Sequence, residues 1–463
     1  EGPMPTEDYR TISFWHETLP DPIEPRAPLE RDEQVDVAIV GAGYTGLWTA
    51  YYLKTLQPDL RVAVLEAQVA GYGASGRNGG WCEGFLAGLD GQLADTRERP
   101  QALALQRAMF DTVDEVGRVA AREGIECHYK KGGYLRLATS GPQLADLEES
   151  MRFYRELGFG DDVWRWLERE EIARRARVPG CRGALYSPHC AAIHPARLAR
   201  GLAAAVERKG VALYERSPVL RIEARRAVTP GGALRADVVV RAVEGYTPRL
   251  PGEKRTLIPL HSQMIATEPL SEALWKEIGL EERETFADSR RTVTYGQRTV
   301  DGRIAFGGRG LYYYGSAIRD RFPADDPLFR RVHESLLSIF PVLADVRITH
   351  RWGGPLAVPR NWRPGVGVDR GRGFAWAGGY VGEGVGATNL AARTLADLIL
   401  ERDTECARLP WAGTSWPRWE PEPLRWLGVK GVRTVGESAD AFEFRHDRTP
   451  RVRAAIFDFF VRK

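Results

Sequence analysis

The sequence predicts an α/β fold in which a Rossmann-type domain with a buried parallel sheet is interleaved with a domain built on a mixed or antiparallel sheet. Two observations carry this prediction. A short apolar strand, a glycine turn and a helix follow one another near residue 35 and again near residue 373, and the stretches between are rich in strand-like alternation. Because the two strand, turn and helix segments lie far apart in the chain, we expect interleaved domains rather than two domains in succession.

The composition is that of an ordinary globular protein. The chain has 463 residues, of which 43% are hydrophobic and 27% charged, with a formal net charge of +3. Two or three domains are therefore expected, and nothing favours nucleic-acid binding. No apolar run is long enough to span a membrane, and no signal peptide is evident. Five cysteines without a CxxC pair indicate reduced thiols in a cytoplasmic protein, with neither a disulfide frame nor a metal site (Cys82, Cys127, Cys181, Cys190 and Cys406).

The first strand, turn and helix begin a βαβ unit. Residues 35–40 are a continuous apolar run, typical of a buried parallel strand, and residues 46–56 carry apolar side chains at helical spacing. Residues 61–66 form a second buried strand. The turn Gly41-Ala42-Gly43-Tyr44-Thr45-Gly46 matches the GxGxxG pattern of dinucleotide-binding proteins.

Each glycine of this turn has a physical reason. Gly41 permits the tight turn, Gly43 lets the backbone approach a pyrophosphate at the helix N-terminus, and Gly46 lets the helix pack closely on the sheet. Glu66 ends the second strand, where its carboxylate can accept hydrogen bonds from a ribose and would repel a 2′-phosphate. The pattern predicts a dinucleotide site that does not take NADP; a glycine turn without a ligand is the alternative.

Two further glycine-rich segments favour FAD as the dinucleotide. In residues 71–81, small residues flank Asn78 and Arg77, and the guanidinium of Arg77 can hold a phosphate; a mobile surface loop is the alternative. Residues 378–386 precede a helix expected at 389–400, whose N-terminus can stabilise negative charge at one edge of a flavin. A simple NAD site does not need this second element, although it can also be a plain strand–helix connection.

The remaining patterns divide the chain into alternating segments. We expect the Rossmann-type FAD-binding domain to comprise residues 34–90, 195–250 and 350–402, and the substrate domain to comprise residues 91–194 and 251–349. Residues 1–33 are expected as an irregular arm and residues 403–463 as a C-terminal extension. The expected helices outside the βαβ unit are 101–123, 142–157, 195–209 and 324–340, and the expected strands are 133–138, 211–214, 219–225, 236–243 and 374–377.

On these segments, the chain resembles the glycine oxidase / D-amino-acid oxidase family of FAD enzymes, and within it the gamma-glutamylputrescine oxidase branch. The resemblance implies a substrate domain over the flavin ring and oxidation of a C–N bond to an imine, which water then hydrolyses. The matching stretches are VDVAIVGAGYTGLWTAYYL, VLEA, GYGASGRNGG, LIPLHSQMIATEPL, THRWGGPLAVPRNWRPGVG and WAGGYVGEGVGATNLAARTLADLI.

The same resemblance implies which residues contact the cofactor. Val219 is expected on a strand that meets the adenine, and Gly245 is expected at a place near the flavin where relatives carry a small residue. The full set is Gly41, Gly43, Tyr44, Thr45, Gly46, Glu66, Ala67, Ala74, Ser75, Gly76, Arg77, Asn78, Gly79, Gly80, Val219, Gly245, Gly379, Tyr380, Gly382, Glu383, Gly384 and Val385.

The chain departs from some relatives in two places. Monomeric sarcosine oxidases tether FAD through a cysteine near the segment equivalent to residues 350–358, where this chain has Trp352 and no cysteine, so we expect non-covalent FAD. Those relatives also use a lysine near the flavin to promote reaction with oxygen. The comparable stretch here offers Arg303 and Arg309 instead, either of which can supply a positive charge.

The predicted reaction is hydride transfer from a small-molecule amine to the flavin, which O2 re-oxidises with release of hydrogen peroxide. Trp352 is the expected pocket wall, because aromatic side chains suit an amine. His261 can take a proton from an ammonium group, and a structural histidine is the favoured alternative. A dehydrogenase that passes electrons to a quinone or a protein, and a non-catalytic flavin-binding scaffold, are the other hypotheses.

The C-terminal extension ends in an expected amphipathic helix. Thr449-Pro450 is typical of a helix start, and Val452, Ile456, Phe459 and Phe460 then form an apolar face. Arg451, Arg453, Arg462 and Lys463 surround this face. Docking on the same protein or on a subunit partner is favoured over a membrane surface, and the sequence leaves the oligomeric state open.

Overall fold

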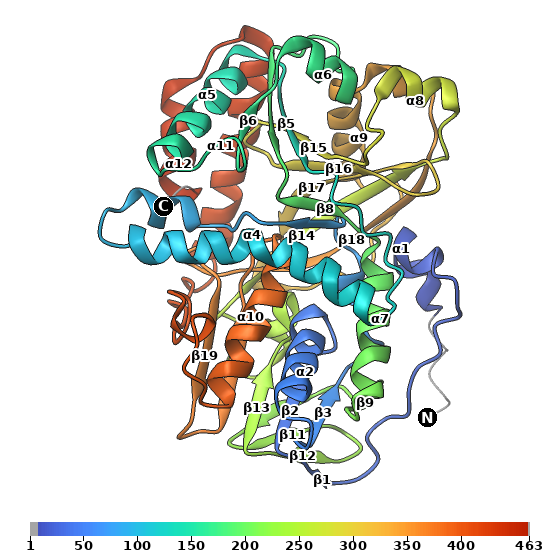
Figure 1. Ribbon diagram of the computed structural model, residues 1–463, viewed down its shortest axis with the longest axis vertical. Helices are drawn as coiled ribbons and strands as arrows, with labels where there is room; N and C mark the ends of the chain where they lie inside the picture. The colour runs from blue at the N-terminus through green and yellow to red at the C-terminus, as the bar shows by residue number, and fades with distance from the viewer. Residues whose placement is uncertain (1–7, 462–463) are drawn as a thin grey trace.

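Two large sheets stacked along the long axis of the molecule form the fold (Figure 1). The computed structural model describes residues 8–461, apart from the side chain of Arg309. A six-stranded sheet occupies the lower half of Figure 1 and an eight-stranded sheet the upper half, with the long helix α4 (Arg99–Arg122) running between them. The α/β fold predicted from the sequence is confirmed.

The six-stranded sheet is the Rossmann-type unit. All neighbours run parallel except β19, which pairs antiparallel with β20. Residues 37–40 are buried on both faces, which explains their continuous apolar run. The sheet order is β19 (Gly365–Asp369), β20 (Phe374–Gly378), β13 (Val238–Arg241), β2 (Val37–Val40), β3 (Val62–Leu65) and β9 (Ala212–Tyr214).

Different layers cover the two faces of this sheet. Ile39 and Val64 pack in a core with α2 (Tyr44–Leu56), α7 (Pro195–Arg208) and α10 (Gly384–Ile399). Ala38 and Leu65 point the other way, toward a small four-stranded sheet. Successive side chains of a strand alternate between its faces, so each core takes every second residue. The small sheet contains β1 (Glu33–Gln34), β12 (Ala233–Arg235), β11 (Arg226–Val228) and β10 (Arg221–Glu223).

The eight-stranded sheet is mixed, because β15 and β5 pair parallel and its other neighbours antiparallel. Its helices are α5 (Gly141–Glu156), α6 (Arg169–Arg175), α8 (Glu272–Ile278) and α9 (Pro327–Ile339). The strand order is β18 (Ile348–Val358), β14 (Ile258–Thr267), β17 (Ile304–Tyr312), β16 (Thr294–Arg298), β15 (Thr285–Asp288), β5 (Tyr134–Ala138), β7 (Gly183–Ser187) and β6 (Arg165–Trp166).

Three local expectations need correction. β18 pairs with β14 over nearly its whole length, so residues 350–358 belong to the eight-stranded sheet and not to the six-stranded sheet of the Rossmann-type unit. The strand expected at 219–225 is shorter, because β10 begins at Arg221 and Val219 lies in the loop before it. The helix expected at 389–400 begins five residues earlier, at Gly384 inside the glycine cluster.

The N-terminal arm is more ordered than expected. It contains a 3₁₀ turn, η1 (Tyr9–Ile12), and a short helix, α1 (Phe14–Glu17). Trp15 is buried, and its indole N–H donates to the backbone oxygen of Asn78 at 2.8 Å. The arm therefore braces the second glycine-rich segment from behind.

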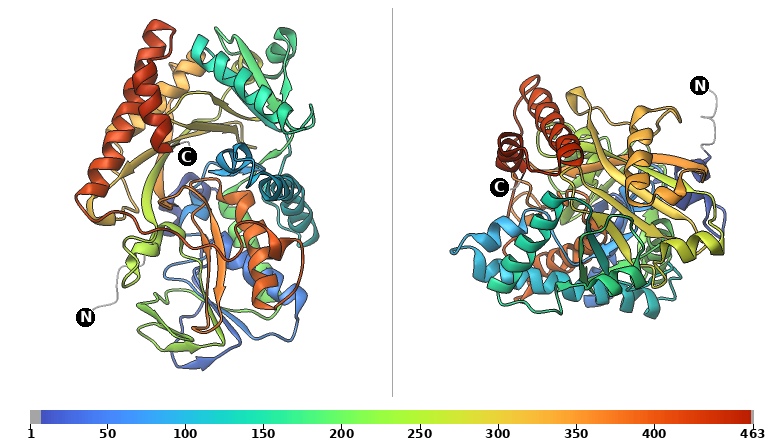
Figure 2. Two further views of the ribbon diagram at one scale, coloured as in Figure 1. Left: turned by 90° about the vertical axis from the view of Figure 1, so that its left-hand side faces the viewer. Right: turned by 90° about the horizontal axis from the view of Figure 1, so that it is seen from above.

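The C-terminal extension crosses from one half of the molecule to the other. Trp411 and Trp419 anchor its irregular first part by burying their rings. Two helices, α11 (Leu424–His446) and α12 (Arg451–Val461), then form a hairpin along one side of the eight-stranded sheet (Figure 2). The predicted apolar side chains of α12 are exposed at its surface, while Arg462 and Lys463 lie outside the described residues. Within residues 8–461, no helix combines the length and apolarity that crossing a membrane requires.

Candidate active site

A cavity of about 660 Å³ joins the two halves of the fold, within the size range of about 300–1,000 Å³ usual for ligand sites. Its lower end is bounded by the β2–α2 turn and β3, and its upper end by the eight-stranded sheet. Four predicted cofactor residues pack behind its wall (Gly46, Gly76, Gly80 and Gly379). The others line it: Gly41, Gly43, Tyr44, Thr45, Glu66, Ala67, Ala74, Ser75, Arg77, Asn78, Gly79, Val219, Gly245, Tyr380, Gly382, Glu383, Gly384 and Val385.

The β2–α2 turn has the steric character that the glycine pattern predicts. Gly41 has a φ of +108°, and a Cβ there would overlap the carbonyl oxygen of Ala242. A Cβ at Gly46 would overlap the carbonyl oxygen of Gly41, so Gly46 holds α2 close to the turn. Gly43 faces the cavity instead, and a Cβ there would meet only the hydroxyl of Ser75, at 3.0 Å. Gly43 as N-cap offers no side chain to cap α2, and the positive end of this helix points to the cavity.

Glu66 sits beside this helix end. Its carboxylate accepts hydrogen bonds from the backbone N–H groups of Ala42, at 2.8 Å, and Gln68, at 3.0 Å. Burial raises the pKa of Glu66 to about 7, against the lowering effect of these two bonds. The side chain is thus fixed at the end of β3 with its carboxylate on the cavity wall.

Hydrogen bonds between its own residues hold the loop 73–80 in shape. The Ser75 hydroxyl accepts from the Tyr44 N–H at 2.8 Å, which ties the loop to the start of α2. The Asn78 amide donates to the carbonyls of Ala74 and Ser75 and accepts from the Gly80 N–H. The loop is therefore a fixed wall rather than a mobile surface segment.

Arg77 and Trp352 have positions that the sequence did not predict. The Arg77 guanidinium is buried and donates to the carbonyls of Tyr72 at 2.7 Å, Asp320 at 2.6 Å and Gly353 at 3.1 Å. These bonds use Nε and Nη1 and join the loop to β18, whereas Nη2 has no hydrogen-bond partner among the described residues. Arg77 also lines the cavity, so its role as a phosphate ligand stays a prediction. The Trp352 indole donates to the Arg77 carbonyl at 2.9 Å and packs behind the loop, so Trp352 is not a pocket wall.

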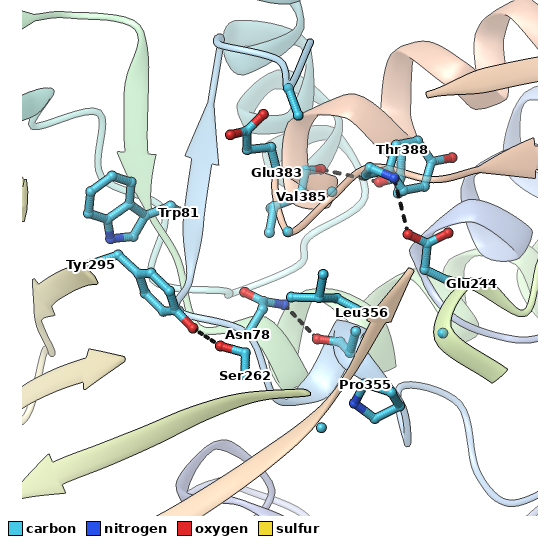
Figure 3. A pocket seen from close by; sticks show the side chains of 18 of the residues that line it. Asn78, Trp81, Glu244, Ser262, Tyr295, Pro355, Leu356, Glu383, Val385 and Thr388 are labelled. Carbon is cyan, nitrogen blue, oxygen red and sulfur yellow. Dashed lines mark hydrogen bonds between the residues drawn. The ribbon is translucent and has the colours of Figure 1, made fainter. Parts of the chain in front are cut away.

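The glycine cluster before α10 forms the opposite wall. Glu244 accepts hydrogen bonds from the backbone N–H groups of Gly379, at 3.0 Å, and Tyr380, at 3.2 Å. Burial raises the pKa of Glu244 to about 7. α10 starts without a side-chain cap, and Glu383 and Val385 at its beginning line the cavity across from Tyr295 (Figure 3). A second positive helix end thus borders the cavity, as the sequence predicts.

The upper end of the cavity is aromatic. The Trp81 ring lies 4.9 Å from Tyr134 and 6.3 Å from Tyr295, centre to centre, and Trp164 continues the row 5.6 Å beyond Tyr134. The Tyr295 hydroxyl is hydrogen-bonded to Ser262 (Figure 3). Trp81 and Tyr134 are not among the site residues predicted from the sequence. The available signal was the position of Trp81 directly after the glycine loop.

Of the other predicted catalytic residues, His261 and Arg303 do not reach this end of the cavity. His261 lies beside Ser262 on β14 but points to the opposite face, where its ring nitrogens bond the Leu311 carbonyl at 3.2 Å and the Arg319 N–H at 2.9 Å. Burial lowers the pKa of His261 to about 4, so the structural reading of this residue holds. Arg303 forms an ion pair with Asp301 at 2.8 Å, away from the cavity. Arg309 pairs with Ser262 in the β14–β17 register, and its side chain lies outside the described part of the chain.

A family model described as FAD dependent oxidoreductase matches residues 36–398, which span the cavity walls formed by both sheets. The chain belongs to this family. Gamma-glutamylputrescine oxidoreductase of Escherichia coli is 33% identical over 387 residues, covering 81% of this chain and 86% of that protein. Probable oxidoreductase OrdL of Haemophilus influenzae is 30% identical, covering 81% and 85%. This FAD-dependent oxidoreductase is thus of the amine and amino-acid oxidase type.

Solved structures show the same fold. Glycine oxidase from Geobacillus kaustophilus superposes with a TM-score of 0.67 at 22% identity, covering 82% of this chain and 98% of its own. Iminodiacetate oxidase from Chelativorans gives a TM-score of 0.64 at 20% identity, with 81% and 99% covered.

The residues present fit FAD. Two helix ends whose own N-cap residues make no capping bond border one cavity, and at Gly43 a Cβ would enter the space before the first of them. An elongated anion with an electron-poor ring needs such a pair of positive ends. Among the described residues, no group of three or more His, Cys, Asp or Glu side chains is arranged to hold a metal ion.

Proposed function

We propose that this FAD-dependent oxidoreductase oxidises a C–N bond of an amine or amino-acid-like substrate to an imine, with dioxygen as the final acceptor and hydrogen peroxide as product. FAD, when bound, is the oxidant that accepts the two electrons released as the C–N bond becomes an imine. The observation that carries the proposal is the continuity of one cavity from the nucleotide-type turn at Gly43 to the aromatic end at Trp81 and Tyr295.

We assign the cofactor to the lower end of this cavity. Glu66 is placed to accept hydrogen bonds from the ribose, and the start of α2 to receive the pyrophosphate. The start of α10 is placed to meet the flavin ring. Gly245 lines the cavity nearby and, because it lacks a Cβ, packs closely against the backbone of Pro355. This assignment agrees with nucleotide binding by the segments of the six-stranded sheet.

We further propose that FAD is held without a covalent bond. Covalent attachment needs a nucleophilic side chain, such as a thiolate, at the cofactor. None of the five cysteines lines the cavity in the described structure. Burial raises the pKa of Cys82, the thiol next to Trp81, so that it stays protonated.

The aromatic end has two tasks in this proposal. The rings of Trp81, Tyr134 and Tyr295 attract an ammonium group through their faces and orient it. They also exclude water around the bound amine, and loss of a proton from the ammonium group then exposes the lone pair that assists C–N oxidation. No histidine of the described residues lines the cavity, whereas the carboxylates of Glu83 and Glu383 do, and either these groups or water can take the proton.

The proposal is tested with purified, FAD-loaded protein. A panel of primary and secondary amines, N-methyl amino acids and D-amino acids is added without air, and bleaching of the visible flavin spectrum is followed. Admission of air should restore the spectrum and release peroxide. Bleaching by no compound would refute the reaction, whereas bleaching followed by very slow recovery in air would identify a dehydrogenase with a quinone or protein acceptor.

A variant pair ties the activity to the aromatic end. Trp81→Ala should raise KM about 2- to 30-fold, the range expected for one cation–π contact of about 0.5–2 kcal/mol. Tyr314→Ala is the matched control, because Tyr314 is exposed at the surface and its loss should change nothing. Equal KM values for the two variants would refute contact between the substrate and Trp81.

A further inference from the structure

The C-terminal hairpin lies outside the part of the chain that matches the family. The family match ends at residue 398, and the hairpin begins at Leu424. The glycine oxidase structure is covered over 98% of its own length but only 82% of this chain. The hairpin therefore lies beyond the residues that the family model describes, and its contacts with the cavity are not part of that match.

Buried polar contacts fix the hairpin to the loop between β15 and β16. The Asp440 carboxylate accepts from the backbone N–H groups of Arg291, at 2.9 Å, and Thr292, at 2.8 Å, and from the Thr292 hydroxyl at 2.5 Å. Glu443, one turn further along α11, forms an ion pair with the Arg291 guanidinium. Asp440 and Glu443 are both buried, so these bonds are shielded from water.

This loop is itself a wall of the cavity. Ser289, Arg290, Arg291 and Val293 all line it, and Arg290 is held by an ion pair with Asp288 at 2.5 Å. A helix that fixes the backbone of residues 291 and 292 therefore fixes the shape of the cavity at this point.

The hairpin also reaches the cavity directly. Phe457 and Val461 of α12 are part of its lining, as is Glu443 of α11. Phe457 is held in place by α11, because its ring lies so close to Gly436 that a Cβ there would be 2.6 Å from it. α12 thus presents two apolar side chains to the cavity, while Phe459 and Phe460 on the same helix are exposed.

A row of aromatic rings lines the cavity from its aromatic end, and a polar band beside this row leads to the loop that the hairpin holds. From Trp81 the row passes through Tyr134 and Trp164 in steps of 4.9 and 5.6 Å. Beside it, Arg136 donates to Ser289 at 2.8 Å and to Ser150 at 3.0 Å, which gives the cavity a polar band before the hairpin. A ligand that extends from the amine site along the polar band reaches residues 289–293, which share the cavity lining with Phe457 and Val461 of α12.

We propose that the C-terminal hairpin is the specificity wall of this enzyme: Phe457 and Val461 contact the part of the substrate distal to the oxidised C–N bond and select amines with an extended chain over short ones. This inference rests on the proposed amine oxidation. It names the substrate class as long-chain amines whose far end carries apolar carbon.

Two series of probes test it on the FAD-loaded enzyme. Linear primary amines from propylamine to decylamine report kcat/KM. Alkyltrimethylammonium ions with the same chains lack the lone pair and the N–H needed to become a neutral imine, so their effect on the flavin spectrum reports Kd alone. In the wild type, Kd should fall about 4-fold for each methylene that reaches the hairpin, as expected for burial of one CH2.

Phe457→Ala should reduce the preference for the longest over the shortest chain about tenfold in both series, with little change for propylamine. Phe459→Ala is the matched control, because it removes the same side chain from the exposed face of α12. Phe457→Leu keeps an apolar contact with Gly436 and shows whether an effect of Phe457→Ala comes only from unfolding of the hairpin. The helix content of each variant is checked by circular dichroism. Asp440→Asn should broaden the chain-length preference by loosening the loop at Thr292.

The outcomes separate the two proposals. Identical chain-length profiles for Phe457→Ala, Phe457→Leu and Phe459→Ala, or a flat profile in the wild type, would overturn the specificity wall. A chain-length profile in Kd that depends on Phe457, without reduction of the flavin by any amine, would support the wall and refute the proposed amine oxidation.

Discussion

Replacement of Gly43 by alanine is expected to weaken FAD binding while leaving the fold intact. Gly43 precedes α2 with φ −83° and ψ −173°, an extended backbone that alanine adopts without strain. Its Cβ would lie 3.0 Å from the Ser75 hydroxyl and would otherwise meet open cavity. The methyl group therefore costs the apoprotein little, but it occupies the space between the helix end and the proposed pyrophosphate.

The size of the effect follows from the bonds at stake. A hydrogen bond from a backbone N–H to a charged group contributes about 1.5–3 kcal/mol. Loss of one such bond raises Kd about 10- to 150-fold. The apoprotein is titrated with FAD by calorimetry, and the melting temperature of the apo form is measured in parallel.

Two other glycine substitutions serve as controls. Gly41→Ala combines a φ of +108° with overlap of the Ala242 carbonyl, so it should lower the melting temperature of the apoprotein as well as FAD affinity. Gly428→Ala, in α11 with no atom within 4 Å of the new Cβ, should leave FAD affinity unchanged. A Gly43→Ala protein that binds FAD as tightly as the wild type would refute the placement of the pyrophosphate at α2.

Three further predictions concern residues around the cavity. Trp352→Phe deletes the 2.9 Å bond to the Arg77 carbonyl and should lower the free energy of unfolding by about 1–2 kcal/mol in urea titrations, with KM nearly unchanged; a large rise in KM at unchanged stability would return Trp352 to the pocket wall. His261→Gln should leave the pH profile of kcat/KM intact. The pKa of His261 is about 4 in the folded protein against an ordinary value of 6.5, so the wild type should lose stability as pH falls through this interval. The variant should lose less stability over the same interval. Equal pH dependence of the melting temperature in the two proteins would contradict this. For Glu244 the sign is opposite, because its pKa is about 7 in the folded protein against an ordinary value of 4.5. The stability of the apoprotein should therefore fall as pH rises between these values, and Glu244→Gln should reduce this fall. An unchanged dependence of stability on pH in the variant would show that Glu244 is not the group responsible.

The parts of the site that lie within one short stretch of chain could be predicted from the sequence. The β2–α2 turn is such a stretch, because the need for glycine arises at residue 41 from its own φ of +108° and at residue 46 from the carbonyl of Gly41. Glu66 follows from the same unit, since it ends the next parallel strand. The helix end at α10 was predicted for a similar reason, although the helix starts inside the glycine cluster rather than after it.

Roles that depend on distant partners were not predictable. Arg77 was expected at a phosphate, and its guanidinium in addition bonds the carbonyls of Asp320 and Gly353, more than 240 positions along the chain. His261 and its neighbour Ser262 lie on opposite faces of β14. The pairing of β14 with β17 and β18 decides which of these faces meets the cavity. Trp352 similarly faces the N-terminal arm, where it contacts Trp15.

The sequence by itself determined the Rossmann-type unit, its preference for FAD and the membership of a family that oxidises amines and amino acids, because glycine sterics and strand periodicity act over a few neighbouring residues. The tertiary structure decided which side chains surround the substrate end. Trp81, Tyr134 and Tyr295 come from three separate strands, and Phe457 arrives from the C-terminal hairpin. Their meeting depends on how the two sheets and the hairpin pack, and such long-range packing leaves no local pattern in the chain.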